Sequence, residues 1–171
     1  RMMYGDCSFE GTDSTGPFRV GYSELEGDNG NRCAVFYPID RATGEDTGRG
    51  KFPLLVRNGG AWLQAAKENA AFILKRNLSH VFFLPFIDVK IPVCIDADLA
   101  PCFIPEKVGE EPARKLVPLI FSHGMLMDGH FYSHLYRELA SYGIMVVALD
   151  HMDGSCSLTE NLKTREAVKF D

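Results

Sequence analysis

The sequence lacks three features that would assign a function at once. No Gly-x-Ser-x-Gly motif occurs in its 171 residues, so no serine in a strand–turn–helix elbow is visible. No cluster of Lys and Arg stands out, and the formal net charge is -5. Because duplex binding depends on clustered basic side chains, this charge argues against a nucleic-acid partner. The most apolar stretch, 78–95, contains two prolines and several polar residues, which excludes a membrane-spanning helix there.

The cysteines and the start of the chain leave the compartment open. The five cysteines are an odd number at irregular spacings. Cys94 and Cys102 would bridge a loop in an oxidising compartment, whereas the plainer interpretation is a set of buried free thiols. The chain begins at Arg1 without an apolar signal segment, which neither supports nor excludes secretion. Secreted and cytoplasmic locations are both compatible with the sequence.

The N-terminal third predicts loop and then two strands. Residues 1–15 are rich in Gly, Ser, Thr and Asp and are expected to be loop. Strand-like runs at 18–25 and 33–37 flank a Gly-Asp-Asn-Gly turn at 27–30. Such a turn between two apolar runs predicts an antiparallel pair, which we place at the edge of a sheet.

The next segments predict a loop and an amphipathic helix. Residues 38–53 are polar and glycine-containing, and are expected to form a surface loop. Apolar residues at helical spacing predict a helix over 62–77. At the other end of the chain, residues 159–171 are expected to begin a helix.

The most informative stretch is 119–125, Leu-Ile-Phe-Ser-His-Gly-Met, a buried-strand pattern that runs into a turn. A helix is predicted over 131–142, closed by a glycine, and a second apolar run at 144–149 ends in Asp150-His151. Strand, turn, helix and strand form a βαβ unit of a parallel sheet. The fold class is therefore α/β, with an antiparallel edge pair followed by parallel strands.

The His-Gly turn is the candidate site. A sharp turn after a parallel strand directs backbone N–H groups into the crevice beyond the carboxyl edge of the sheet, where an oxyanion would develop. We expect the donor to be the N–H of Met125, with His123 and Gly124 forming the turn and the glycine permitting it. The alternative is a plain strand-to-helix turn of any α/β fold.

No nucleophile, acid or base is assigned within the chain. Ser122 lies at the end of the strand and is expected to be structural. His123 and His151 are conceivable bases, but neither is expected to have a serine beside it. We therefore predict that this segment alone is inactive.

Neither a metal nor another cofactor is predicted. His130 and His134 are four residues apart and would share one face at the start of the helix. The sequence lacks the glutamate that follows the first histidine in the zinc-protease helix motif. We interpret both residues as surface or pocket side chains.

The run Val-Phe-Phe-Leu-Pro-Phe-Ile at 81–87 has two interpretations. Seven consecutive apolar residues are most often core. The functional alternative is that part of the run is exposed and rests on lipid or lines an acyl site, and Val81, Phe82 and Phe83 are then the lipid-facing candidates.

Three blocks together resemble the platelet-activating factor acetylhydrolase family, which comprises lipoprotein-associated and intracellular type II phospholipases. They are Val-Pro-Leu-Ile-Phe-Ser-His-Gly-Met at 117–125, Leu-Ala-Ser-Tyr-Gly at 139–143, and Val-Val-Ala-Leu-Asp-His-Met-Asp-Gly-Ser at 146–155. The opening run at 16–25 and Val-Phe-Tyr-Pro at 35–38 also resemble the family's first strands. The likeness covers residues 16–160. Met152 and Gly154 depart from it, because family members often carry Arg there.

The resemblance implies an α/β-hydrolase fold, of which residues 1–171 would be one partial domain, the N-terminal half of the sheet. It implies calcium-independent hydrolysis of short or oxidised acyl groups of phospholipids, with the serine, aspartate and histidine falling after Asp171. Met125 would then be the oxyanion donor. The region 67–83 resembles the segment by which the lipoprotein-associated enzyme touches lipid, so a membrane or lipoprotein surface is an expected partner.

Two other functions are compatible with the same residues. Another α/β-hydrolase, such as a carboxylesterase or polyester hydrolase, would share the His-Gly turn. A truncated hydrolase that acts as a lipid-surface binding module would need no catalytic residues. We disfavour this module because a parallel sheet stopped after few strands exposes an apolar edge.

Overall fold

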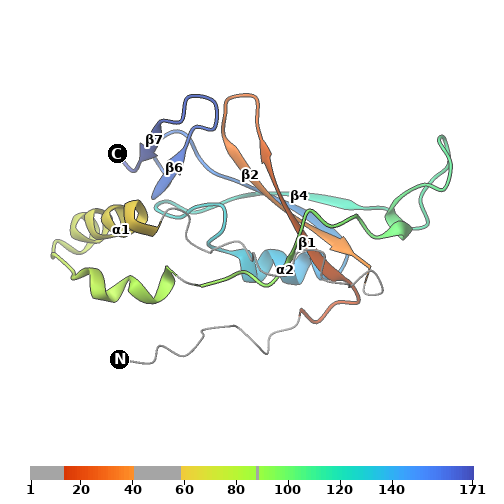
Figure 1. Ribbon diagram of the computed structural model, residues 1–171, viewed down its shortest axis with the longest axis horizontal. Helices are drawn as coiled ribbons and strands as arrows, with labels where there is room; N and C mark the ends of the chain where they lie inside the picture. Colours follow the sequence, from red (N-terminus) through yellow and green to blue (C-terminus); the bar gives the residue numbers. More distant parts are fainter. Residues whose placement is uncertain (1–13, 41–58, 88) are drawn as a thin grey trace.

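The computed structural model describes residues 14–40, 59–87 and 89–171. Most of the loop predicted over 1–15 and most of that over 38–53 lie outside these ranges. The described chain forms a five-stranded mixed sheet, a separate two-stranded hairpin, two α-helices and three short 3₁₀ turns. Figure 1 shows the arrangement of these elements.

The five-stranded sheet has the order β3-β1-β2-β5-β4. Its strands are β1 (Arg19–Glu26), β2 (Arg32–Ile39), β3 (Cys94–Ile95), β4 (Val117–Ser122) and β5 (Ile144–Leu149). The predicted antiparallel pair is β1 with β2, and the predicted parallel pair is β4 with β5. Two-residue β3, which the sequence did not predict, lies parallel to β1 on its outer side. The pair therefore does not form the edge of the sheet as predicted, because β2 is the central strand and β3 flanks β1. The fold class is α/β, as predicted.

Helix α2 (Ser133–Ser141) connects β4 to β5 and packs on the sheet against β1, β2 and β5. Its moderately apolar face contributes Tyr136 and Ala140 to a core that also contains Phe36 and Val146, all four of them fully buried. The rings of Phe36 and Tyr136 lie 5.3 Å apart between centroids. The βαβ unit is therefore fastened to the N-terminal hairpin through one aromatic cluster.

Strand β4 differs from the buried strand that its sequence predicts. It forms hydrogen bonds with β5 on one side, and it is the last strand of the sheet among the described residues. Val117 and Ile120 are 55% and 71% exposed. Only Phe121 is half-buried, because its ring packs at 4.9 Å from that of Tyr136. The apolar composition of β4 therefore exceeds the burial that the described residues provide.

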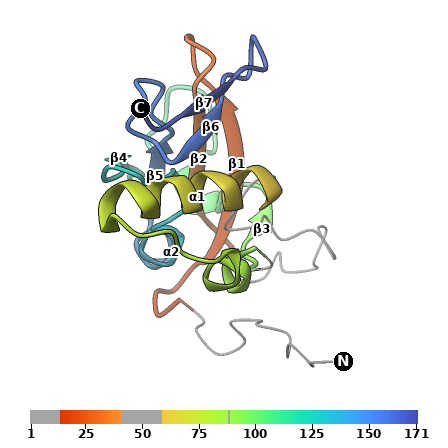
Figure 2. The same cartoon turned by 90° about the vertical axis from the view of Figure 1, so that its left-hand side faces the viewer.

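The other helical segments lie at the end of the sheet. They are α1 (Gly59–Leu74), η1 (His80–Phe82) and η2 (Leu84–Phe86), while η3 (Pro101–Phe103) belongs to the connection before β4. The helix predicted over 62–77 is thus confirmed with a shift of three residues. Figures 1 and 2 show α1 across one end of the sheet rather than on either face. Within the described ranges, no helix is long and apolar enough to cross a membrane.

The helix expected to begin within 159–171 is wrong. This segment forms a hairpin of β6 (Leu158–Glu160) and β7 (Ala167–Lys169). The side chain of Asn161 accepts hydrogen bonds from the N–H groups of Lys163 and Thr164, which fixes a turn, and Arg165 has φ +63°. Asparagine hydrogen-bonds its own following backbone in turns, and this local bonding overrides a weak helical pattern.

The cysteines that the structure describes are thiols rather than disulfides. Cys33 and Cys156 are buried, while Cys94 and Cys102 are half-buried and unbridged. Burial raises the pKa of Cys33, and the nearby Asp150 carboxylate adds to this rise. The bridge between Cys94 and Cys102 is therefore not formed here.

Replacing Phe36 by alanine should test the aromatic cluster. The cavity is expected to lower the free energy of unfolding by about 3–5 kcal/mol, as measured by urea denaturation. Leu25→Ala is the control, because Leu25 is 55% exposed and should cost no more than about 0.5 kcal/mol. Equal effects of the two substitutions would show that this cluster does not hold the hairpin to the βαβ unit.

Candidate functional site

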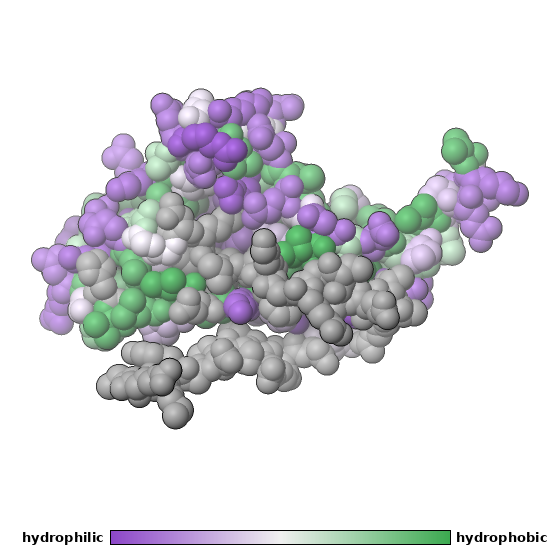
Figure 3. Space-filling view, viewed as in Figure 1, coloured by the Kyte–Doolittle hydropathy of each residue, from purple (hydrophilic) through white to green (hydrophobic). Residues whose placement is uncertain are grey.

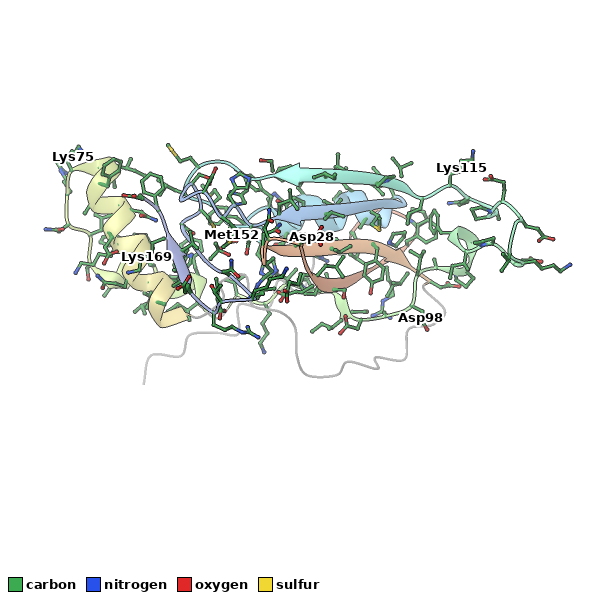
Figure 4. The ribbon with its side chains drawn as sticks, turned by 90° about the horizontal axis from the view of Figure 1, so that it is seen from above. Asp28, Lys75, Asp98, Lys115, Met152 and Lys169 are labelled. Carbon is green, nitrogen blue, oxygen red and sulfur yellow. The ribbon has the colours of Figure 1, made fainter. Side chains whose placement is uncertain are left out.

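The candidate site is the turn formed by residues 123–127, which we call the β4 turn. Ser122, the last residue of β4, is paired with Leu149, the last residue of β5. The two strands therefore end side by side, and the segments after them meet at one edge of the sheet. Figure 4 shows both strands pointing toward the end of the molecule that carries α1, with Met152 in the loop beyond β5. We call residues 150–157 the β5 loop.

Met125 is exposed and its backbone N–H is available. The residue is 66% exposed, and its N–H donates no hydrogen bond to any group in the described part of the chain. The two residues that follow differ: the N–H of Leu126 donates to Ser155 O at 2.8 Å and that of Met127 to Gly124 O at 3.2 Å. An unpaired N–H beyond the carboxyl edge of a parallel sheet is suited to bind an oxyanion.

Leu126, rather than Gly124, has the unusual backbone conformation in this turn. Its φ is +67°, in the left-handed region, whereas Gly124 does not have a positive φ. The expectation that the glycine permits the turn is therefore wrong in its detail. A branched side chain in the left-handed region costs of order 1–2 kcal/mol, and such strain persists only where surrounding contacts impose it.

Hydrogen bonds to the segment that follows β5 impose this conformation on Leu126. Besides the bond from Leu126 to Ser155 O, the N–H of Ser157 donates to Met127 O at 3.1 Å. The N–H of Gly129 donates to Oδ1 of Asp150 at 2.7 Å, and the hydroxyl of Thr159 donates to Oδ2 of the same carboxylate. Asp150 is 3% exposed, so these are buried, charge-assisted bonds of the stronger kind.

His123 lies buried at the base of the turn, with 4% of its surface exposed. Its Nδ1 is 2.9 Å from Gly124 O, and its Nε2 is 3.3 Å from the backbone N of His151. A carbonyl only accepts and an N–H only donates, so we assign the proton to Nδ1 and a lone pair to Nε2. The ring also stacks on that of His151, with centroids 3.9 Å apart.

A second set of contacts starts from Ser122. Its Oγ is 2.9 Å from Nε2 of His151, which contradicts the expectation that no serine lies beside this histidine. His151 Nδ1 is 2.8 Å from Ser155 Oγ, which donates in turn to Asp153 at 2.6 Å. The contacts that connect Ser122 to Asp153 were not predicted from the sequence, although His151 and Asp153 closely follow a strand that pairs with β4.

The hydrogen bond from Ser155 to Asp153 determines which atoms donate and which accept in the bonds that connect Ser122, His151 and Ser155. Ser155 donates its single hydroxyl proton to Asp153, so it accepts from His151, and we assign the ring proton to Nδ1. With the proton on Nδ1, Nε2 accepts from Ser122. Hydrogen bonds from the hydroxyl and the N–H of Ser155 lower the pKa of the Asp153 carboxyl. Gly154, between them, has φ +85°, a left-handed conformation that glycine adopts without steric cost.

The two histidines considered as metal ligands are separated by the fold. His130 precedes α2, is 1% exposed, and lies with Nε2 at 2.6 Å from the hydroxyl of Tyr22. His134 is on α2 and exposed. In the described ranges, no group of three His, Cys, Asp or Glu side chains is arranged to hold a metal ion.

The three lipid-facing candidates, Val81, Phe82 and Phe83, differ in their exposure to solvent. Val81 and Phe82 are 64% and 66% exposed, whereas Phe83 is half-buried with its ring 6.2 Å from that of Trp62. Four residues of η1 and η2 make up what we call the apolar patch: Val81, Phe82, Leu84 and Phe86. Figure 3 shows apolar surface where these turns lie, beneath α1.

The fold of the chain is similar to that of a solved esterase structure. The structure of a ferulic acid esterase from Streptomyces cinnamoneus matches 92% of this chain with a TM-score of 0.52 and 17% sequence identity. The chain covers 40% of that esterase. The mixed sheet, the parallel βαβ unit and this match define an α/β-hydrolase fold.

The family is shown by sequence. Residues 8–171 match the model of platelet-activating factor acetylhydrolase, isoform II, and the chain belongs to this family. A platelet-activating factor acetylhydrolase of Bos taurus is 43% identical over 52 residues, which are 30% of this chain and 12% of that protein. A putative phospholipase A2 of Schizosaccharomyces pombe is 44% identical over 45 residues, 26% and 10% of the two chains. The matched stretches thus span about a tenth of these relatives' length.

The strain at Leu126 can be measured with two substitutions that both remove its side chain. Leu126→Gly should be more stable than Leu126→Ala by about 0.5–1 kcal/mol in urea unfolding, because only glycine accepts a positive φ without cost. Gly124→Ala is the control: its added Cβ would meet nothing closer than the Tyr132 hydroxyl at 3.6 Å, so stability should not fall. Higher stability of Leu126→Ala would contradict the assigned conformation.

Proposed function

We propose that this chain supplies the oxyanion donor and the lipid-facing segment of a serine-dependent hydrolase. Its substrates are short or oxidised acyl esters of phospholipids, of the 1-alkyl-2-acetylglycerophosphocholine type. The observation that carries the proposal is the free Met125 N–H on a strained, clamped turn at the carboxyl edge of the sheet. Membership of the acetylhydrolase family supports the same reaction class.

In this reaction a serine outside the described elements passes its proton to a general base, also outside them, and attacks the ester carbonyl, whose oxygen becomes an anion. The lipid alcohol then leaves with that proton, and water hydrolyses the acyl-serine. The N–H of Met125 donates to the carbonyl oxygen, and a fixed donor requires no reorganisation as the charge develops. The methionine side chain, 66% exposed, would line the entrance to the acyl site. No general base is assigned to the described residues for this reaction.

The position of the apolar patch favours a phospholipid over a water-soluble ester. The patch lies on η1 and η2, at the end of the sheet toward which β4 and β5 point. Three residues at the end of α1, Phe72, Ile73 and Leu74, are also more than half exposed. A lipid surface held at this end would present its esters near the β4 turn, which a hydrolase of soluble esters does not require.

Removing the Met125 N–H should abolish most catalysis in the full-length protein that contains this sequence. Met125→Pro replaces the N–H, and kcat on an sn-2 thioacetyl phosphocholine lipid is expected to fall by about 100-fold or more. Met125→Ala is the matched control, since it keeps the N–H and should retain kcat within about threefold.

Proline also restricts the residue before it, so a second replacement separates the N–H from the backbone shape. An α-hydroxy acid incorporated at position 125 exchanges the amide for an ester and leaves the turn free to form. The proposal predicts that it loses activity as Met125→Pro does. Full activity of the ester-containing protein would exclude Met125 as the donor.

Charging the apolar patch should weaken lipid binding. The double variant Val81→Asp/Phe82→Asp is expected to reduce the fraction that floats with phosphatidylcholine vesicles at least about tenfold, because each buried apolar side chain contributes about 1.5–3 kcal/mol. Val108→Asp is the control, since Val108 is fully exposed in the connection before β4. Phe83 is left unchanged, because it packs on Trp62. Equal flotation of the double variant and the control would remove the patch as a lipid contact.

A further inference from the structure

His151 and Ser155, both in the β5 loop, contact the β4 turn. The proposed reaction does not itself use these contacts. His151 contacts the turn in two ways: its N–H donates to Nε2 of His123, and its ring stacks on that of His123. Its Nε2 also lies 2.9 Å from the hydroxyl oxygen of Ser122, the last residue of β4. Its Nδ1 lies 2.8 Å from the hydroxyl oxygen of Ser155.

Ser155 closes a loop of contacts back to the turn. Its hydroxyl binds His151 and Asp153, while its carbonyl oxygen accepts the N–H of Leu126 at 2.8 Å. Leu126 is the strained residue and follows Met125 directly. A rotation of Ser155 would therefore release the bond that holds Leu126 at positive φ, and the peptide planes on either side of Met125 would turn with it.

We propose that His151 is the positioning residue of the β4 turn, acting through Ser155 and His123 to direct the Met125 N–H at the developing oxyanion. The inference rests on the proposed function and deepens it by naming what aims the donor. Asp153 anchors the far end of the contacts, because it accepts from both the hydroxyl and the N–H of Ser155. With the proton of His151 assigned to Nδ1, each contact in this set has one donor and one acceptor.

The two ring nitrogens of His151 have different partners, so substitutions that replace one nitrogen or the other are expected to differ in activity. Nδ1 reaches Ser155, which is bonded to Leu126, whereas Nε2 reaches Ser122, which is already held by β4. Asparagine places an N–H donor near the position of Nδ1, and glutamine places an acceptor near that of Nε2. If the path through Ser155 aims the donor, asparagine replaces the histidine better than glutamine does.

The test uses the full-length protein and the sn-2 thioacetyl phosphocholine lipid. His151→Ala is expected to lower kcat by about 10- to 100-fold with KM within twofold, since a misaligned donor weakens only the transition state. His151→Asn should recover most of this loss and His151→Gln little of it. His134→Ala, an exposed histidine on α2, is the control and should leave kcat unchanged.

A purely structural role would give a different pattern. It would lower the melting temperature and affect Asn and Gln variants equally, without a loss confined to kcat. Ser155→Ala provides a second variant that keeps the carbonyl acceptor but loses both hydroxyl contacts, and it should lower kcat as His151→Ala does. Unchanged kcat in His151→Ala, or equal recovery by Asn and Gln, would overturn the inference.

Hydrogen exchange separates this inference from the proposed function. In the folded full-length protein, His151→Ala should speed amide exchange in a peptide covering residues 123–129 at least tenfold and leave a peptide covering β5 unchanged. This readout does not need activity. If the wild-type protein fails to hydrolyse the lipid, the proposed function falls. Unaltered exchange in the variant would overturn the role of His151.

Discussion

The parallel pairing of β4 with β5 is the constraint on which the rest of the structure depends. Because Ser122 is in register with Leu149, the turn after one strand and the loop after the other are brought to the same edge. A shift by one residue would move His123 away from His151 and break the stacking that fixes both rings. The aromatic cluster of Phe36, Tyr136 and Phe121 holds this pair to the N-terminal hairpin.

The site shows how a costly backbone conformation is maintained. Leu126 adopts a left-handed φ that its side chain disfavours, and bonds from Leu126, Ser157 and Gly129 to acceptors across the edge offset this cost. The bond from Leu126 to Ser155 occupies the N–H that follows Met125, while the N–H of Met125 itself makes no hydrogen bond among the described residues. Strain, hydrogen bonding and an unpaired donor are therefore parts of one arrangement, which is the expected design of a preorganised electrostatic site.

The sequence predicted the βαβ unit and the antiparallel pairing of the N-terminal strands, because period, turn residues and a family resemblance all pointed the same way. It could not predict the contact of Ser122 with His151, which depends on the register of two strands separated by a helix. The prediction of a helix in residues 159–171 was wrong, because hydrogen bonds to the side chain of Asn161 stabilise a turn there. The predicted burial of β4 was too high. Its apolar composition shows that the strand is suited to a buried position, but the described residues do not cover it.

The most direct test is a crystal structure of the full-length protein with a phosphonate covalently bound to its nucleophilic serine, which mimics the tetrahedral intermediate. We expect a phosphonyl oxygen within about 3.1 Å of the Met125 nitrogen, with Leu126 still at positive φ and bonded to Ser155. An oxygen held by other donors, with the Met125 N–H bonded to a protein carbonyl, would contradict the central claim that this turn binds the oxyanion.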